Sequence, residues 1–175
     1  KAVQRIKAVM KEEMVRIVRY EPLQENYGKT EFKEMFDTFA DTILADHSIY
    51  DRIEVDSSIE YDFADALDGE NKVSLFIKLP GWYEIDTPIG KYNPDWALII
   101  EKTALEGEKV KTQHYFVVET KGTSDLSKLR DEERTKIECA VKHFEAIGLK
   151  EYLAPIDTIQ TFKEKANAKV GEIVL

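Results

Sequence analysis

The sequence predicts an α/β domain in which helices pack against a small, mixed or mostly antiparallel sheet. Apolar residues recur every three or four positions in the first third of the chain, a spacing typical of amphipathic helices. From Val73 the pattern changes to runs typical of strands, and helical spacing returns after residue 125. At 175 residues, of which 43% are hydrophobic, the chain is long enough for one domain with its own core.

Two helices are expected in an N-terminal segment, residues 1–50, at residues 2–19 and 30–45. We expect this segment to link to, or pack against, a missing part of the protein, because the chain starts with Lys1 and not with Met. The folded domain is then expected to cover residues 51–175.

A third helix is expected over residues 58–68. Asp56, Ser57 and Ser58 offer side-chain oxygens that can cap its first turn, and Gly69 is a typical stop.

The next segments read as strands separated by Pro and Gly turns, and a helix and a last strand follow them. The expected strands or extended segments are residues 73–79, 82–87, 96–101 and 114–120. A fourth helix, capped by Ser127 or Asp125, is expected to run to about Ile147, and a last strand is expected over residues 156–162.

The chain is acidic, with 34 Asp and Glu against 25 Lys and Arg and a formal net charge of −9. Nucleic-acid binding driven by net charge alone is therefore disfavoured, unless metal ions neutralise a carboxylate cluster or a missing part of the protein supplies the grip. The single cysteine excludes a disulfide framework and a four-cysteine zinc site. Because no run of about 18 apolar residues exists, no membrane partner is expected.

The candidate chemistry lies where two apolar strands meet polar residues. Asp95 precedes one of these strands, and Glu119 and Lys121 lie at the end of the other. Side chains alternate along a strand, so Glu119 and Lys121 project from the same face. If the two strands pair as a hairpin with Ala97 roughly opposite Val117, Asp95 lies near both of them.

Two acids and a lysine in this arrangement suit a site for a divalent metal ion. Carboxylate oxygens are hard ligands for Mg²⁺, and the backbone carbonyl of Thr120 is a further candidate ligand. A bound ion would lower the pKa of a water, while Lys121 could position or deprotonate that water or offset charge on a phosphate. The same pattern also fits a charged pair where two strands emerge into solvent, so the residues alone leave both interpretations open.

Several segments of the chain resemble the C-terminal cleavage domain of the restriction (Res) subunit of type III restriction endonucleases. The resemblance covers about residues 54–147, with the segments in the same order. Its segments are Ser58-Ile59-Glu60-Tyr61-Asp62-Phe63-Ala64, Leu79-Pro80-Gly81-Trp82-Tyr83, Thr87-Pro88-Ile89-Gly90-Lys91-Tyr92-Asn93-Pro94-Asp95-Trp96-Ala97, Tyr115-Phe116-Val117-Val118-Glu119-Thr120-Lys121-Gly122, and the helix with Leu129-Arg130, Glu133, Lys136-Ile137, Cys139 and His143-Phe144.

This resemblance implies a restriction-endonuclease-like PD-(D/E)XK fold, a small mixed central sheet flanked by helices, here with an N-terminal helical extension. By position in the motif, Asp95, Glu119 and Lys121 would be the catalytic residues. Glu60 matches a helix position that supplies a further metal contact in many members of the superfamily. Lys91 and Lys136 are candidate DNA contacts.

The resemblance also implies cofactors and partners. Mg²⁺ would be the cofactor, with Mn²⁺ as a substitute, and double-stranded DNA would be the substrate. A methyltransferase (Mod) subunit and the helicase/ATPase portion of the same full-length subunit would be the partners, with ATP used only in that missing portion. The expected location is the cytoplasm of a bacterium or archaeon.

Other patterns carry less weight. Gly28-Lys29-Thr30 resembles the end of a Walker A loop, but Leu23 stands where its first glycine belongs. Cys139 and His143 are spaced like two zinc ligands on a helix, but a packed thiol is favoured because the chain has no other cysteine. Core or turn packing is favoured over base stacking for three aromatic residues: Trp82, Tyr92 and Trp96.

Two other functions stay open from the sequence. One is a non-catalytic docking domain between helicase and methyltransferase, in which the helices of residues 1–45 would pack on a partner. The other is a structure-specific nuclease of the same superfamily, of the repair or resolvase type.

Overall fold

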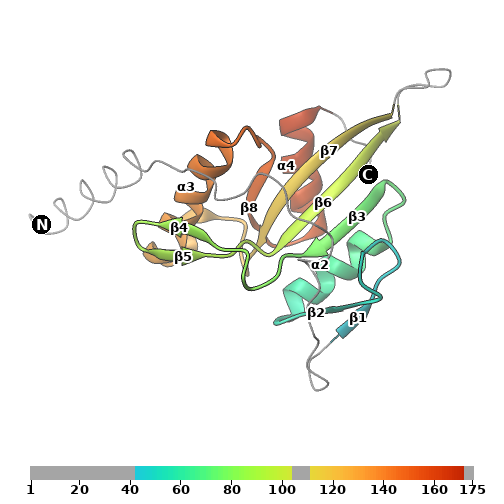
Figure 1. The fold of residues 1–175 in the computed structure, drawn as a ribbon, viewed down its shortest axis with the longest axis horizontal. Helices are drawn as coiled ribbons and strands as arrows, with labels where there is room; N and C mark the ends of the chain where they lie inside the picture. Colours follow the sequence, from blue (N-terminus) through green and yellow to red (C-terminus); the bar gives the residue numbers. More distant parts are fainter. Residues whose placement is uncertain (1–41, 104–110, 172–175) are drawn as a thin grey trace, which may run out of the picture.

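The computed structural model describes residues 42–103 and 111–171 (Figure 1). The helix predicted over residues 2–19 and most of the helix predicted over 30–45 lie outside these described residues. Within the described part of the chain, no helix is long and apolar enough to cross a membrane.

The prediction of a helix over residues 30–45 is wrong at its C-terminal end, where a small two-stranded sheet begins. Residues Thr42–Leu44 form strand β1, which pairs antiparallel with β2 (Arg52–Glu54). Ile43 lies opposite Ile53, and both side chains are buried. Pairing with β2 therefore decides the structure of this short apolar segment, and the helical spacing around it does not.

The main sheet has four strands in the order β3-β6-β7-β8 and is mixed, as predicted. β3, β6 and β7 are antiparallel neighbours, whereas β8 runs parallel to β7. The strands are β3 (Val73–Lys78), β6 (Trp96–Thr103), β7 (Lys111–Thr120) and β8 (Tyr152–Ile156).

The register of the β6–β7 hairpin confirms the pairing on which the predicted site depends. Ala97 lies opposite Val117, and Trp96 lies opposite Val118. Continuing this antiparallel register by one residue brings Asp95 level with Glu119. The two acids therefore lie side by side at the open end of the β6–β7 hairpin, where the two central strands of the sheet end.

A second small sheet lies beside helix α3 (Asp131–Ala146) in Figure 1. It is a hairpin of β4 (Ile85–Thr87) and β5 (Gly90–Tyr92), so the extended segment predicted over 82–87 is a strand only in its second half. Gly90 has a φ of +116°, a backbone conformation that favours glycine, and it lies at the turn of the hairpin.

The helix α2 (Ser58–Asp68) matches the prediction, with the Ser57 side chain accepting from the backbone N–H of Glu60 and Gly69 at its end. The next predicted helix begins later than expected, because a short 3₁₀ turn, η2 (Leu126–Lys128), stands before α3. Asp125 caps η2, and α3 has its own start, where Glu133 accepts from the backbone N–H of Arg130.

The last strand predicted, residues 156–162, is wrong. β8 ends at Ile156, and helix α4 (Ile159–Val170) begins after Thr158, whose side chain accepts from the N–H of Thr161. The β-branched residues around Thr158 favour a strand locally. The helix wins because it buries Phe162 completely against the sheet.

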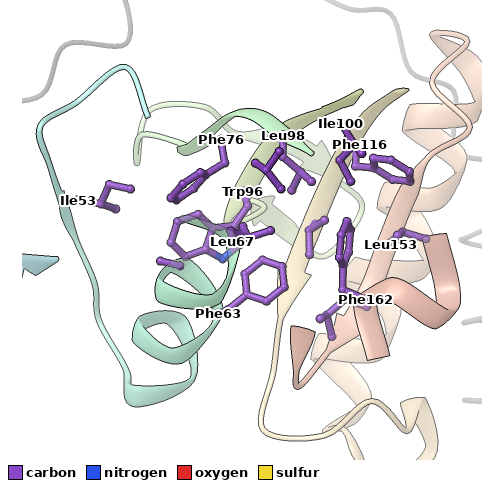
Figure 2. Packing of buried hydrophobic residues seen from close by; sticks show 14 of the residues in the cluster. Ile53, Phe63, Leu67, Phe76, Trp96, Leu98, Ile100, Phe116, Leu153 and Phe162 are labelled. Atoms are coloured by element: carbon purple, nitrogen blue, oxygen red, sulfur yellow. The ribbon is translucent and has the colours of Figure 1, made fainter. Parts of the chain in front are cut away.

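The alternation of side chains along β7 divides the core into two layers. Phe116 and Val118 belong to the layer that contains the buried residues of α2 and α4 (Figure 2). Val117 belongs to the other layer, which contains the buried residues of α3. Glu119 follows Val117 on the same face by the period of a strand, so it lies at the edge of the α3 layer.

Candidate active site

Asp95, which directly precedes β6, accepts hydrogen bonds from residues of both neighbouring strand segments. Its Oδ2 accepts hydrogen bonds from the backbone N–H of Thr120 at 2.7 Å and from the Thr120 hydroxyl at 2.6 Å. Its backbone carbonyl accepts from the N–H of Leu79 at 2.7 Å, just after β3. Both Thr120 donors therefore use the same oxygen, Oδ2, which fixes the orientation of the Asp95 carboxylate.

Glu119 is 3% exposed, and each of its carboxylate oxygens has one partner. Oε1 lies 2.6 Å from the Nζ of Lys121, and Oε2 accepts a hydrogen bond of 2.8 Å from the hydroxyl of Tyr92. Burial and the nearby charge of Asp95 raise the pKa of Glu119 to about 7, although Lys121 and Tyr92 act in the opposite direction. A carboxyl with this pKa holds its proton much more readily than an exposed glutamate does.

Asp95 and Lys121 belong to the same electrostatic group. Burial raises the pKa of Asp95, and Glu60 raises it further, while the Thr120 bonds and the charge of Lys121 oppose that rise. Burial lowers the pKa of Lys121, but its attraction to Glu119 and Asp95 is larger and leaves the pKa raised. The predicted convergence of Asp95, Glu119 and Lys121 is thus present in the fold, with the lysine held as a cation.

Glu60 lies near enough to Asp95 to affect its pKa, but another partner occupies its side chain. Glu60 Oε2 lies 2.7 Å from the Nζ of Lys78 and accepts from the backbone N–H of Asp56 at 2.8 Å. Lys78 also contacts the carboxylate of Asp56 at 2.6 Å. The sequence reasoning missed Lys78, which ends β3 opposite Trp96.

The two lysines expected to contact DNA each have acidic neighbours. Lys91 Nζ lies 2.7 Å from Asp86, on the neighbouring strand of the small hairpin. Lys136 Nζ lies 3.2 Å from Glu132, one helical turn away on α3. Glu133 contacts Arg130.

Three aromatic side chains near the site have different environments. Trp96 is fully buried and Tyr92 is 6% exposed, as expected for core packing. Trp82 is 44% exposed and lies outside the core, in the turn after β3, where its ring packs edge-on against that of Tyr83 with centroids 6.4 Å apart.

Sequence reasoning also missed the role of two tyrosines. Tyr92 donates to Glu119, and the hydroxyl of Tyr152 on β8 contacts the hydroxyl of Tyr92. Tyr92 could have been noticed from the sequence, because it stands three residues before Asp95. Tyr152 carried no such signal, because only the parallel pairing of β8 with β7 brings it opposite Val117.

Comparison with family models gives a match to the description "Endonuclease domain" over residues 46–164. The chain belongs to this family. The match spans β3, β6, β7, β8, α2 and α3, and it contains all three residues at the strand edge. The endonuclease domain therefore has a restriction-endonuclease-like α/β fold and belongs with the nucleases, which are hydrolases. Comparisons with curated proteins and with solved structures gave no match.

The donor atoms of the endonuclease domain fit a hard divalent cation. Asp95 and Glu119 are buried acids, and the charge of Asp95 raises the pKa of Glu119, so a cation between them would relieve their repulsion. Among the described residues, no group of three or more His, Cys, Asp or Glu side chains is arranged to hold a metal. A site here would therefore combine two carboxylates with other oxygens such as a backbone carbonyl or water, which Mg²⁺ accepts.

Proposed function

We propose that this endonuclease domain is the metal-dependent cleavage module of a type III restriction–modification enzyme and hydrolyses phosphodiester bonds of double-stranded DNA. The observation that supports hydrolysis is the meeting of Asp95, Glu119 and Lys121 at one sheet edge, within a chain of the endonuclease family. The type III assignment is supported by the motif resemblance over residues 54–147.

Asp95 and Glu119 would hold Mg²⁺, with Mn²⁺ as a substitute, and the Thr120 carbonyl would be a further ligand. The ion, when bound, supplies positive charge for the phosphate and lowers the pKa of a water. Lys121 remains protonated because its pKa is raised, so its ammonium group acts as a hydrogen-bond donor. It would orient the water, or stabilise the phosphate oxygens. The water oxygen would bond to phosphorus and release its proton to solvent, while the P–O ester bond breaks and the leaving oxygen takes up a proton from solvent.

Glu60 is a candidate for a further metal contact, but its present partner is Lys78. The contacts of Glu60 with Lys78 and Asp56 use Oε2, so an ion bound by Glu60 would either take Oε1 or exchange with Lys78 at Oε2, and Lys78 also contacts Asp56. This exchange is possible without unpairing Lys78.

Four lysines of the described residues near the site are each paired with an acid, so these lysines offer little free positive charge for holding DNA: Lys78, Lys91, Lys121 and Lys136. We assign DNA binding and recognition of the target sequence to the helicase/ATPase portion and the methyltransferase (Mod) subunit. Lys91 and Lys136 stay candidate DNA contacts, each of which would exchange a carboxylate for a phosphate. The proposed setting is the cytoplasm of a bacterium or archaeon.

The first experiment measures Mn²⁺ binding by titration calorimetry in the wild-type domain and in Asp95→Ala and Glu119→Ala. We expect binding in the wild type and its loss in both variants, with circular dichroism spectra that show an intact fold. Lys163→Ala is a matched control, because Lys163 is half-buried and paired with Glu70. Glu70 follows the C-terminal end of α2, which lies about 12 Å along the helix from Glu60. Equal Mn²⁺ affinity in all four proteins would refute the metal site.

The second experiment uses the intact subunit with its methyltransferase. Lys121→Ala is expected to stop DNA cleavage while ATP hydrolysis continues, because the substitution removes only a group at the strand edge. Normal cleavage by this variant would refute the catalytic assignment. Cleavage by the wild type that needs neither ATP nor the methyltransferase would favour a repair or resolvase-type nuclease.

A further inference from the structure

Two buried tyrosine hydroxyls form a chain of hydrogen bonds that ends on Glu119. Tyr92 donates to Glu119 Oε2 at 2.8 Å, and the hydroxyl of Tyr152 contacts that of Tyr92. A tyrosine hydroxyl has one proton, and Tyr92 uses that proton in its hydrogen bond to Glu119, so Tyr152 is the donor in the second bond. The hydrogen bonds therefore connect Tyr152 on β8, through Tyr92 on the β4–β5 hairpin, to the carboxylate of Glu119 on β7.

The surroundings of these hydroxyls are apolar. Tyr92 and Tyr152 are each 6% exposed and belong to the core layer under α3. The ring of Tyr152 stacks on Phe144 of α3, with centroids 5.0 Å apart. Burial holds the pKa of both tyrosines well above the ordinary value, so both stay protonated donors. Two hydroxyls are costly to bury without partners, and Glu119 is the acceptor that ends the chain.

Glu119 is thus held from two sides, by Lys121 on Oε1 and by Tyr92 on Oε2. If Lys121 turns toward a water or a phosphate during the proposed reaction, its contact with Oε1 is lost. The bond from Tyr92 does not compete with that movement, because Tyr92 uses the other oxygen. It also leaves lone pairs on both oxygens for a cation.

We propose that Tyr92, held in place by Tyr152, is a positioning residue that fixes the Glu119 carboxylate for a divalent cation. This inference rests on the proposed function of the site. It also makes the β4–β5 hairpin part of the active site, because Tyr92 ends that hairpin. In other proteins, mutating a residue that orients a metal-binding side chain typically lowers metal affinity or activity by about 10- to 100-fold.

The experiment compares Mn²⁺ affinity, measured by titration calorimetry, in Tyr92→Phe, Tyr152→Phe and the double variant. Tyr92→Phe should weaken binding about 10-fold or more. Tyr152→Phe should have a smaller effect, because Tyr92 still donates to Glu119. The double variant should equal Tyr92→Phe, since the outer hydroxyl acts only through the inner one. Tyr115→Phe is the matched control, an exposed tyrosine on the same strand as Glu119.

A second measurement does not depend on metal. The carboxyl carbon signal of Glu119 in ¹³C NMR spectra of the metal-free domain should move in Tyr92→Phe and stay in place in Tyr115→Phe. An unchanged Glu119 signal, or unchanged Mn²⁺ affinity in a folded Tyr92→Phe, would overturn the positioning role. If the wild type binds no Mn²⁺, the proposed function fails, and the carboxyl signal still decides the positioning role. If Tyr92→Phe does not fold, the same two measurements are made on Tyr152→Phe. We then expect a weaker affinity for Mn²⁺ and a moved Glu119 carboxyl signal, and an unchanged affinity and signal would overturn the inference.

Discussion

Replacing Glu119 with glutamine should remove a pH-dependent cost to the stability of the domain. The pKa of Glu119 is raised from 4.5 to about 7 in the folded state. Below pH 4.5 the carboxyl is protonated in both the folded and the unfolded chain and contributes nothing. Between pH 4.5 and 7 the unfolded chain releases a proton that the folded chain keeps, so stability falls as pH rises. Above pH 7 the full cost is present.

The size of this cost follows from the two pKa values. The interval from 4.5 to about 7, at 1.36 kcal/mol for each pH unit, corresponds to about 3 kcal/mol. Glutamine at position 119 has no proton to exchange, but its oxygen can still accept from Tyr92. Lys121 loses its carboxylate partner, which adds an offset to the comparison; in the wild type Glu119 and Asp95 hold the pKa of Lys121 above its ordinary value, so this lysine does not titrate over the range. The difference between the two proteins should therefore change with pH by about 3 kcal/mol, in favour of the variant.

The assay is urea unfolding of the wild type and Glu119→Gln at several pH values from 4.5 to 8, without divalent metal. Fluorescence of Trp96 can follow unfolding, because this side chain is fully buried in the folded domain. The free energy of unfolding of Glu119→Gln minus that of the wild type should increase from pH 4.5 to about pH 7 and then level off. A difference that is constant with pH would refute the reasoning, because it would mean that Glu119 titrates alike in both states.

Three further substitutions test parts of the fold that support the site. Lys78→Met should lower the free energy of unfolding in urea by about 1–3 kcal/mol, because Glu60 loses its ammonium partner. It should also tighten Mn²⁺ binding in calorimetry several-fold, whereas Lys163→Met, which breaks a remote pair, should not. Phe162→Ala should cost about 3–5 kcal/mol in urea unfolding, because it empties a fully buried position; a change below 1 kcal/mol would contradict the packing of α4. Ser57→Ala should lower the thermal unfolding midpoint by removing about 1 kcal/mol of capping from α2, and an unchanged midpoint would contradict the cap.

The predicted meeting of Asp95 and Glu119 depended on local features of the sequence. Two apolar runs separated by a polar stretch predict a hairpin, and the antiparallel register then brings the residues at their open ends together. The partners of these acids could not be predicted in the same way. Tyr152 reaches the site from a parallel strand, and Lys78 reaches Glu60 from a strand that pairs on the other side of β6.

Wrong predictions concentrated in segments where local preference and long-range packing disagree. Residues 156–162 contain β-branched side chains that favour a strand, yet α4 begins at Ile159 and buries Phe162 between rings from α2 and β7. Residues 42–44 follow a helical spacing, yet they form β1 because β2 offers a partner for their backbone.

The order of residues along this chain determined which side chains lie at strand ends and which faces of α2 and β7 are apolar, because these properties depend on near neighbours and on fixed backbone periods. Only the tertiary structure decided that Glu119 is buried between a lysine and a chain of two tyrosine hydroxyls. The reason is physical: burial and hydrogen bonding at that position come from segments distant in sequence, which contribute only after the sheet and α3 have packed together.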